Sequence, residues 1–156
     1  SIHDTYFRSQ YGAHTLSSFY IFKDNFLLGV GNKNFREECK KYEKKVINFQ
    51  KKIEPYAEIY LKGCSTHPHQ IYNELLSEHG LLGTIIIIGL LFCLIIKNKF
   101  LLISSKIRLV ALIYILTVFL PVIPSGSFFT TTISVFFWIN ILFYLVIFEE
   151  KSINVS

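Results

Sequence analysis

The sequence has no methionine and little charge: Lys, Arg, Asp and Glu make up 17% of its 156 residues. About a quarter of the residues in an average soluble domain are charged, so this composition argues against an ordinary soluble domain. Intrinsic disorder is excluded as well, because a disordered chain is poor in hydrophobic residues and this chain is 51% hydrophobic. Because an initiator methionine is missing, we interpret the sequence as a piece of a longer membrane polypeptide.

Charge is missing above all from the C-terminal half. Of the 27 charged residues, 20 lie in residues 1–79, and the stretches 80–96 and 109–148 contain none. A helix needs about 20 apolar residues to cross a membrane, so the longer stretch can hold two helices. Segment 121–127 contains two prolines and a glycine, which predicts the break between them.

We therefore predict an all-α fold: a fragment of a polytopic membrane protein in which a helical extramembrane loop precedes three spans. The loop is expected at residues 1–79 and the membrane region at 80–148, with spans at about 78–96, 108–123 and 129–148. Buried helices of a large soluble protein are the alternative, although such helices rarely lack a polar stripe.

The orientation follows from the short loop 97–108, which has four positive and no negative side chains. The positive-inside rule places this loop in the cytoplasm. Residues 1–79 are then outside the cytoplasm, because loops longer than about 60 residues cross largely regardless of their charge. The tail 149–156 is expected in the cytoplasm.

Residues 35–53 show the clearest helical pattern of the N-terminal segment. Apolar residues recur at alternating steps of four and three and form one stripe. Asn34 is the expected N-cap, with Glu37 three residues later as in a capping box. Six lysines cover the remaining surface, which is either an ordinary solvated face or a face that contacts anionic lipid headgroups or phosphates. A second apolar helical stretch is expected at 16–22.

Gly29-Val-Gly31 precedes this helix. No third glycine and no strand-helix-strand unit accompany it, so a dinucleotide fold is not indicated. The pattern predicts a tight turn that leads backbone amides into the start of the helix, where a phosphate can bind.

The chain has three cysteines. Cys93 lies within a predicted span, where we interpret it as an apolar packing residue. Cys39 and Cys64 lie in the predicted exported segment, where oxidising conditions favour a disulfide. The alternatives are two free thiols, or a zinc site with His67 and His69 whose spacing matches no standard zinc finger.

The segment from Cys64 to Gly83 is richest in groups that can perform chemistry. Pro68 fits the first turn of a helix, with Thr66 or His67 as its cap. His67 and His69 would then lie at a helix N-terminus at the membrane surface, where an anion binds well. A histidine titrates near neutral pH, so this pair is a candidate general base, with a purely structural pair as the alternative.

Three segments, in this order, resemble the family of O-antigen ligases and O-antigen polymerases: IFKDNFLLGVGNKNFREEC, CSTHPHQIYNELLSEHGLLG and PSGSFFTTTISVFFW. The family pattern has a Gly-x-Gly-x-x-x-Phe turn in a large periplasmic loop, a His-x-His-Asn element and a Glu-x-Gly-Leu-x-Gly entry into the next span. Gln70 stands here where the family usually has Asn. The resemblance covers nearly the whole chain and indicates the C-terminal portion of such a protein.

The resemblance implies a role for several residues. His69 would be catalytic, and His67 would share or position that role. Glu78 would orient a histidine or the acceptor, or would be an ordinary interfacial residue. The residues expected to bind diphosphate or substrate are Arg36, Gly29, Gly31, Arg8, His14 and Glu78, with His14 at a position where relatives carry arginine.

The resemblance also implies an enzyme, a metal-independent glycosyltransferase without a cofactor. It would transfer a glycan from an undecaprenyl-diphosphate carrier to a hydroxyl of lipid A-core or of a growing glycan, at the periplasmic face of the bacterial inner membrane. Nucleic acid is not an expected partner, because the net charge of +5 comes from a topology-setting loop and a lysine-rich helix. The alternatives are a protein O-oligosaccharyltransferase and a transport or structural membrane protein.

Overall fold

The computed structural model describes residues 2–97, 106–121, 126–129 and 132–145. The all-helical class expected from the sequence is confirmed for these residues, which contain no strand. They form six helices: α1 (Ile2–Arg8), α2 (Gln10–Asp24), α3 (Phe35–Ile53), α4 (Ile71–Lys97), α5 (Lys106–Val118) and α6 (Thr132–Leu145).

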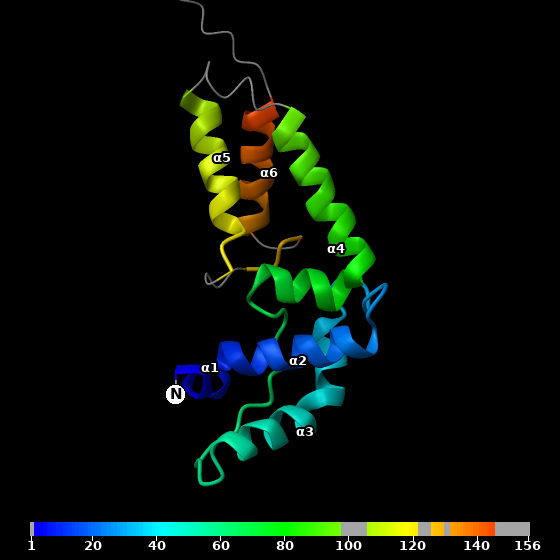
Figure 1. Ribbon diagram of the computed structural model, residues 1–156, viewed down its shortest axis with the longest axis vertical. Coiled ribbons are helices and arrows are strands. Elements are labelled where there is room, and N and C mark those ends of the chain that lie inside the picture. The colour runs from blue at the N-terminus through cyan, green and yellow to red at the C-terminus, as the bar shows by residue number, and fades with distance from the viewer. Residues whose placement is uncertain (1, 98–105, 122–125, 130–131, 146–156) are drawn as a thin grey trace, which may run out of the picture.

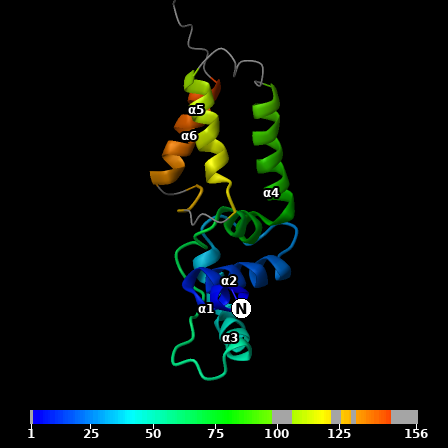
Figure 2. The same ribbon diagram turned by 60° about the vertical axis from the view of Figure 1, so that its left-hand side comes forward.

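The helices lie in layers along the long axis of the molecule (Figure 1). Helix α3 lies at one end, α1 and α2 form the next layer, and the first turns of α4 lie across the top of that layer. The rest of α4 rises beside α5 and α6 to the other end, as Figure 2 shows from another side. We call residues 2–79 the N-terminal unit, and α4 after Gly80 together with α5 and α6 the apolar unit.

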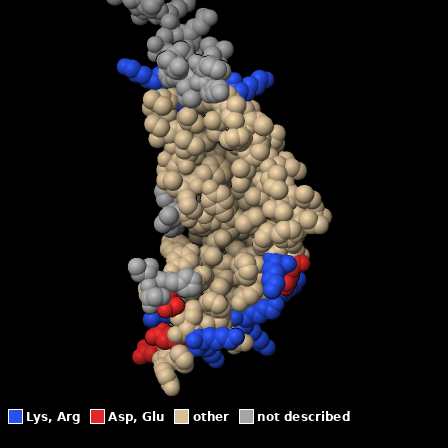
Figure 3. All heavy atoms as spheres, viewed as in Figure 1, with Lys and Arg blue, Asp and Glu red and all other residues tan. Residues whose placement is uncertain are grey.

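Charged side chains are absent from a broad band of the surface seen in Figure 3. They gather over the N-terminal unit and, in smaller number, at the opposite end of the molecule. Such a band is the surface that a bilayer can cover. Among the described residues, α4 is the one helix that is both long and apolar enough to cross a membrane.

Within the described residues, helices α5 and α6 are shorter than the spans that the sequence predicts. They have 13 and 14 residues, so each is about 20 Å long at 1.5 Å per residue, against a hydrocarbon core of about 30 Å. Three spans and the orientation of the loop 97–108 therefore stay predictions. The predicted span ends at 123 and 148 and the tail 149–156 lie outside the described residues.

Two apolar clusters hold the N-terminal unit together. Helix α3 has the predicted bounds, and its buried stripe packs on α2. Helix α2 contains the predicted apolar stretch but is longer, because Ser9 caps its start by accepting a bond from the Gly12 amide (3.1 Å). Cys39 of α3 and Cys64 form a disulfide, with Cα atoms 5.4 Å apart. The disulfide ties the segment before α4 to α3 and leaves no thiolates for a zinc site.

Candidate functional site

The histidine segment lies before α4 and not in its first turn. Helix α4 begins at Ile71, and His69 has a left-handed backbone with φ 57°. A right-handed helix cannot continue through such a residue. The expected cap at Thr66 or His67 is therefore wrong, and Gln70 caps the helix instead. Its side-chain oxygen accepts a bond from the Asn73 amide (2.8 Å).

Three histidine rings meet at this point. The ring centroid of His69 is 4.1 Å from that of His67 and 5.3 Å from that of His14. His14 comes from the buried face of α2, so the packing of α2 against the histidine segment brings the group together. The Ser65 hydroxyl is 3.0 Å from Nε2 of His69, and the Thr66 hydroxyl is 3.0 Å from Nδ1 of His67.

Burial lowers the pKa of all three histidines below its ordinary value. The imidazole of His69 lowers the pKa of His14 and of His67 further, although the Gly63 carbonyl opposes the shift at His14. A histidine with a lowered pKa is neutral at neutral pH and keeps one ring nitrogen that can accept a proton. The cluster is therefore suited to act as a base.

A cavity of about 220 Å³ opens beside His69. His67 and His14 do not line it, so His69 is the member of the cluster that a ligand would meet. No Lys or Arg of the described residues lines it either. The walls come from α1, α2, the segment before α4 and the end of the segment after α5: Tyr6, Tyr11, Thr15, Pro68, His69, Gln70 and Pro121.

Polar contacts attach the segments around α5 and α6 to the start of α4. The Tyr72 hydroxyl donates to the Phe119 carbonyl (2.7 Å), and the Gln70 amide donates to the Pro121 carbonyl (3.4 Å). The buried carboxylate of Glu74 accepts bonds from the Ser127 hydroxyl (2.5 Å) and the Phe128 amide (2.8 Å). These contacts hold Pro121 in the cavity wall.

The turn at Gly29 and Gly31 docks on a break in α4 at Gly80, where φ is 64°. The Val30 and Gly31 amides donate to the carbonyls of Ser77 (3.1 Å) and Glu78 (2.8 Å). A Cβ atom on Gly29 or on Gly80 would lie 2.5 Å from backbone atoms of the other segment. Both positions need glycine because two backbones touch there.

Glu78 completes this joint. Its buried carboxylate accepts bonds from the amides of Lys33 (2.9 Å) and Phe35 (3.2 Å). Asn34 stands at the N-cap position of α3, but its side chain makes no cap bond. The structure thus gives Glu78, Gly29 and Gly31 contacts that dock the turn on α4, since the turn amides bond to acceptors within the chain. Their expected role in substrate binding stays a prediction.

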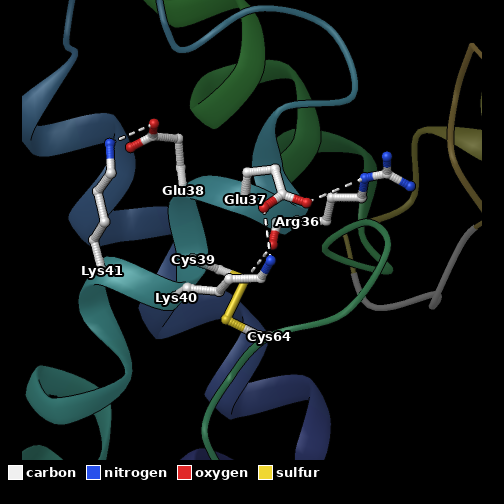
Figure 4. A network of polar contacts seen from close by, with 7 residues as sticks. All are labelled: Arg36, Glu37, Glu38, Cys39, Lys40, Lys41 and Cys64. Carbon is white, nitrogen blue, oxygen red and sulfur yellow. Dashed lines mark hydrogen bonds and ion pairs between the residues drawn. A yellow bond between two sulfur atoms is a disulfide. The ribbon is translucent and has the colours of Figure 1, made fainter.

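The two arginines expected to bind diphosphate lie away from the histidine cavity. Arg36 is exposed at the start of α3 and its Nε atom is 3.7 Å from Glu37, which also bonds Lys40 (2.6 Å; Figure 4). Arg8 pairs with Glu54. Neither arginine lines the cavity at His69.

Most of α3, which carries the lysine-rich face, lies at the end of the molecule that is remote from the apolar unit (Figures 1 and 2). Several of its lysines pair with carboxylates, as Lys41 does with Glu38 (2.6 Å; Figure 4). This position favours the solvated face over contact with lipid headgroups. Within the described part of the chain, no three His, Cys, Asp or Glu side chains are placed to hold a metal ion.

Sequence reasoning missed four contributors to the site: Tyr6, Tyr11, Thr15 and Glu74. Tyr11 lies three positions before His14 in α2, and Thr15 lies one position after it. Tyr11 and Thr15 are four positions apart. Spacing of three or four places side chains on one helix face, so Tyr11 offered a usable signal. Glu74 offered none, because its partners lie more than 50 positions away.

The fold and the site together define a class: an all-helical protein, in its described residues, whose histidine cavity lies near the start of a helix that is long and apolar enough to cross a membrane. Residues 13–88 match the family model described as O-antigen ligase. The resemblance seen in the sequence is therefore confirmed, and this segment, about half of the chain, is similar to the O-antigen ligase family. The match spans α2, the glycine turn, α3, the histidine segment and the larger part of α4.

Proteins of this family are integral to bacterial membranes, and the match suggests an enzyme of the glycan ligase or polymerase type. No curated protein and no solved structure matches the chain.

Proposed function

We propose that this protein is a membrane glycosyltransferase of the O-antigen ligase or polymerase type. It transfers a glycan from an undecaprenyl-diphosphate carrier to a hydroxyl of a lipid-linked or glycan-linked acceptor at the periplasmic face of the inner membrane. The observation that carries the proposal is the position of the His69 imidazole in the wall of a cavity, inside the segment that matches the family.

His69 is the general base. If its Nε2–H donates to the Ser65 hydroxyl, Nδ1 is left free to accept the proton of the acceptor hydroxyl. The acceptor oxygen then bonds to the anomeric carbon of the glycan. The bond from that carbon to the diphosphate oxygen breaks, and its electron pair leaves with the carrier diphosphate.

The backbone at His69 supports this assignment. A left-handed conformation costs a non-glycine residue about 1 kcal/mol or more, and such strain gathers at functional sites. His67 and His14 stand behind the base, where their rings limit its motion and help to exclude water. Of the residues expected to bind substrate, His14 is the one that contacts this imidazole.

The cavity walls suit a hydroxyl-rich ligand. Tyr6, Tyr11, Thr15 and Gln70 line the cavity. The Tyr6 and Thr15 hydroxyls are 2.9 Å apart, and the Gln70 side chain bonds the Asn73 amide and the Pro121 carbonyl. Each hydroxyl can both donate and accept a hydrogen bond, as a sugar hydroxyl can. The disulfide between Cys39 and Cys64 agrees with a periplasmic position, because disulfides persist in oxidising compartments.

The test compares His69→Ala with His67→Ala in the full-length protein in membranes, with glycan transfer as the readout. A positioned general base contributes about 10²- to 10⁴-fold. We expect His69→Ala to lower kcat at least about a hundredfold. We expect a smaller loss in His67→Ala, because that side chain does not line the cavity.

Folding is monitored separately through the amount of protein in the membrane and the formation of the disulfide between Cys39 and Cys64. A His69→Ala protein that is present at normal level and transfers glycan at nearly the wild-type rate would overturn the assignment of the base. Transfer by neither the wild type nor any variant would overturn the proposed function and favour a transport role.

A further inference from the structure

A second and larger cavity, of about 400 Å³, lies at the end of the N-terminal unit that is remote from the apolar unit. Arg8 of α1, Gln50 of α3 and the loop 54–60 line it. We call it the distal cleft. It lies outside the roles assigned above, and Arg8, which the sequence suggested for diphosphate, belongs to it.

The floor of the distal cleft is fixed by hydrogen bonds. The buried Gln50 side chain donates to the Phe7 carbonyl (3.1 Å) and accepts from the Leu61 amide (2.8 Å). The Tyr60 hydroxyl bonds the carbonyls of Glu54 (2.9 Å) and Pro55 (3.0 Å). These bonds join α1, α3 and the loop, so the cleft is formed before any ligand arrives.

The groups at the rim fit a sugar ring. Tyr56 is 95% exposed, so almost none of its aromatic side chain contacts the rest of the folded protein. Its ring offers a flat face to the C–H side of a pyranose and its hydroxyl offers a hydrogen bond. Next to it the ion pair of Arg8 and Glu54 presents a donor and an acceptor together, which is what a sugar hydroxyl needs.

The charge of the distal cleft argues against a phosphate ligand. Arg8 lines the cleft together with two carboxylates, those of Glu54 and Glu58, so the ionisable side chains of the lining have a net negative charge. An anion would be repelled, whereas a neutral ligand rich in hydroxyls would not. The cleft therefore differs in kind from a site for the carrier diphosphate.

The distal cleft and the cavity at His69 lie on either side of α1. Tyr6 lines the cavity at His69 and Arg8 lines the distal cleft. Two residues along a helix are about 200° apart, so these side chains leave α1 on nearly opposite faces. A helix is about 10 Å across, so a ligand that occupies both cavities must be several sugar rings long.

We propose that the distal cleft binds an uncharged stretch of the glycan chain whose reacting end lies at His69. The proposal rests on the proposed function, and it adds a second contact that only a glycan of more than one repeat can reach. Tyr56 carries the contact, with Arg8 and Glu54 as the polar partners.

The experiment uses the full-length protein in lipid nanodiscs and the glycan of the producing bacterium. The glycan is released from its carrier by mild acid and separated into single-repeat and multi-repeat fractions. Tyr56→Ala should weaken binding of the multi-repeat fraction about tenfold, the value of one aromatic contact, and leave the single repeat unchanged. Tyr56→Trp should retain binding, and Phe19→Ala, which removes an exposed ring outside both cavities, should match the wild type.

A transfer assay with the same variants identifies the source of the chain. If KM rises in Tyr56→Ala for multi-repeat donors with kcat unchanged, the distal cleft holds the donor glycan. If KM rises instead with the length of the acceptor, the distal cleft holds the acceptor glycan, and the proposal stands in either case.

The proposal is overturned if Tyr56→Ala and Phe19→Ala bind every fraction as the wild type does. It is also overturned if the wild type binds multi-repeat and single-repeat glycan equally. The binding measurement also distinguishes a failure of this proposal from a failure of the proposed function. A protein that transfers no glycan can still be tested for stronger binding of the longer glycan.

Discussion

The N-terminal unit and the apolar unit are held together by different means. The N-terminal unit has a disulfide, buried polar side chains such as His14 and Gln50, and small apolar clusters between amphipathic helices. In the apolar unit, helices α5 and α6 pack on each other mainly through apolar residues such as Ile115 and Phe137, while large side chains such as Leu90 remain exposed.

The difference shows which solvent each unit is built for. A surface of exposed Leu, Ile and Phe is unfavourable in water and suits lipid, where it costs nothing. The two units meet where two backbones touch, at Gly29 and Gly80, and where Glu74 holds the segment after α5. The candidate site lies at this junction, so its chemistry depends on the two units keeping their relative position.

The largest effect on stability is expected from adding a side chain at Gly80, where the backbones of the two units touch. Gly80→Ala places a methyl group about 2.5 Å from backbone atoms of Leu27 and Gly29, and gives a left-handed φ to a residue with a side chain. The two penalties together amount to about 4 kcal/mol. We expect a strongly lowered unfolding temperature in the full-length protein and loss of glycan transfer.

Gly89→Ala is the matched control, because it lies in the same helix and a Cβ there meets nothing within 4 Å. This variant should unfold at or slightly above the wild-type temperature, since alanine is the better helix former. Equal behaviour of the two variants would mean that the units do not touch at Gly80.

The next effect concerns the N-terminal unit alone. The disulfide between Cys39 and Cys64 closes a loop with a sequence separation of 25, and its removal should cost about 3 kcal/mol. A Cys39→Ser, Cys64→Ser variant should unfold at a lower temperature than the wild type. A reductant should lower the unfolding temperature of the wild type and leave that of the variant unchanged.

Cys93→Ser serves as the control, because Cys93 is an exposed free thiol of the apolar unit. Its unfolding temperature and its response to reductant should equal those of the wild type. If reductant leaves the wild type unaffected, the N-terminal unit does not depend on the disulfide for its stability.

The features that could be predicted from the sequence are those that local residue patterns determine. The stripe of α3 gave its bounds, and a charge-free stretch identified α4 as an apolar helix. The type of compartment favoured the disulfide between Cys39 and Cys64, which the structure contains. The family resemblance suggested His69 as a catalytic residue, and that role stays a prediction. Each of these features depends on residue types at short spacing.

Contacts between distant segments could not be predicted in this way. The docking contacts of Glu78 could not be predicted, because nothing local shows that its carboxylate accepts bonds from the amides of Lys33 and Phe35. Pro68 looked like a helix start, but the left-handed turn at His69 delays the helix to Ile71. The arrangement of His14 beside His69 arises only when α2 packs on the histidine segment.

The smallest effect is the pH dependence of the junction. Burial lowers the pKa of His14, His67 and His69 below the ordinary value of 6.5. As the pH falls below 6.5, the unfolded chain takes up protons before the folded protein does, so folding becomes less favourable. The stabilisation is complete above pH 6.5 and is lost as the pH falls through the folded pKa values.

Glycan transfer should fall over the same range, because a protonated His69 cannot accept a proton. The unfolding temperature and kcat/KM, measured against pH, should therefore show an acid limb with a midpoint below 6.5; a midpoint above 6.5 would show that the histidines are stabilised in their charged form.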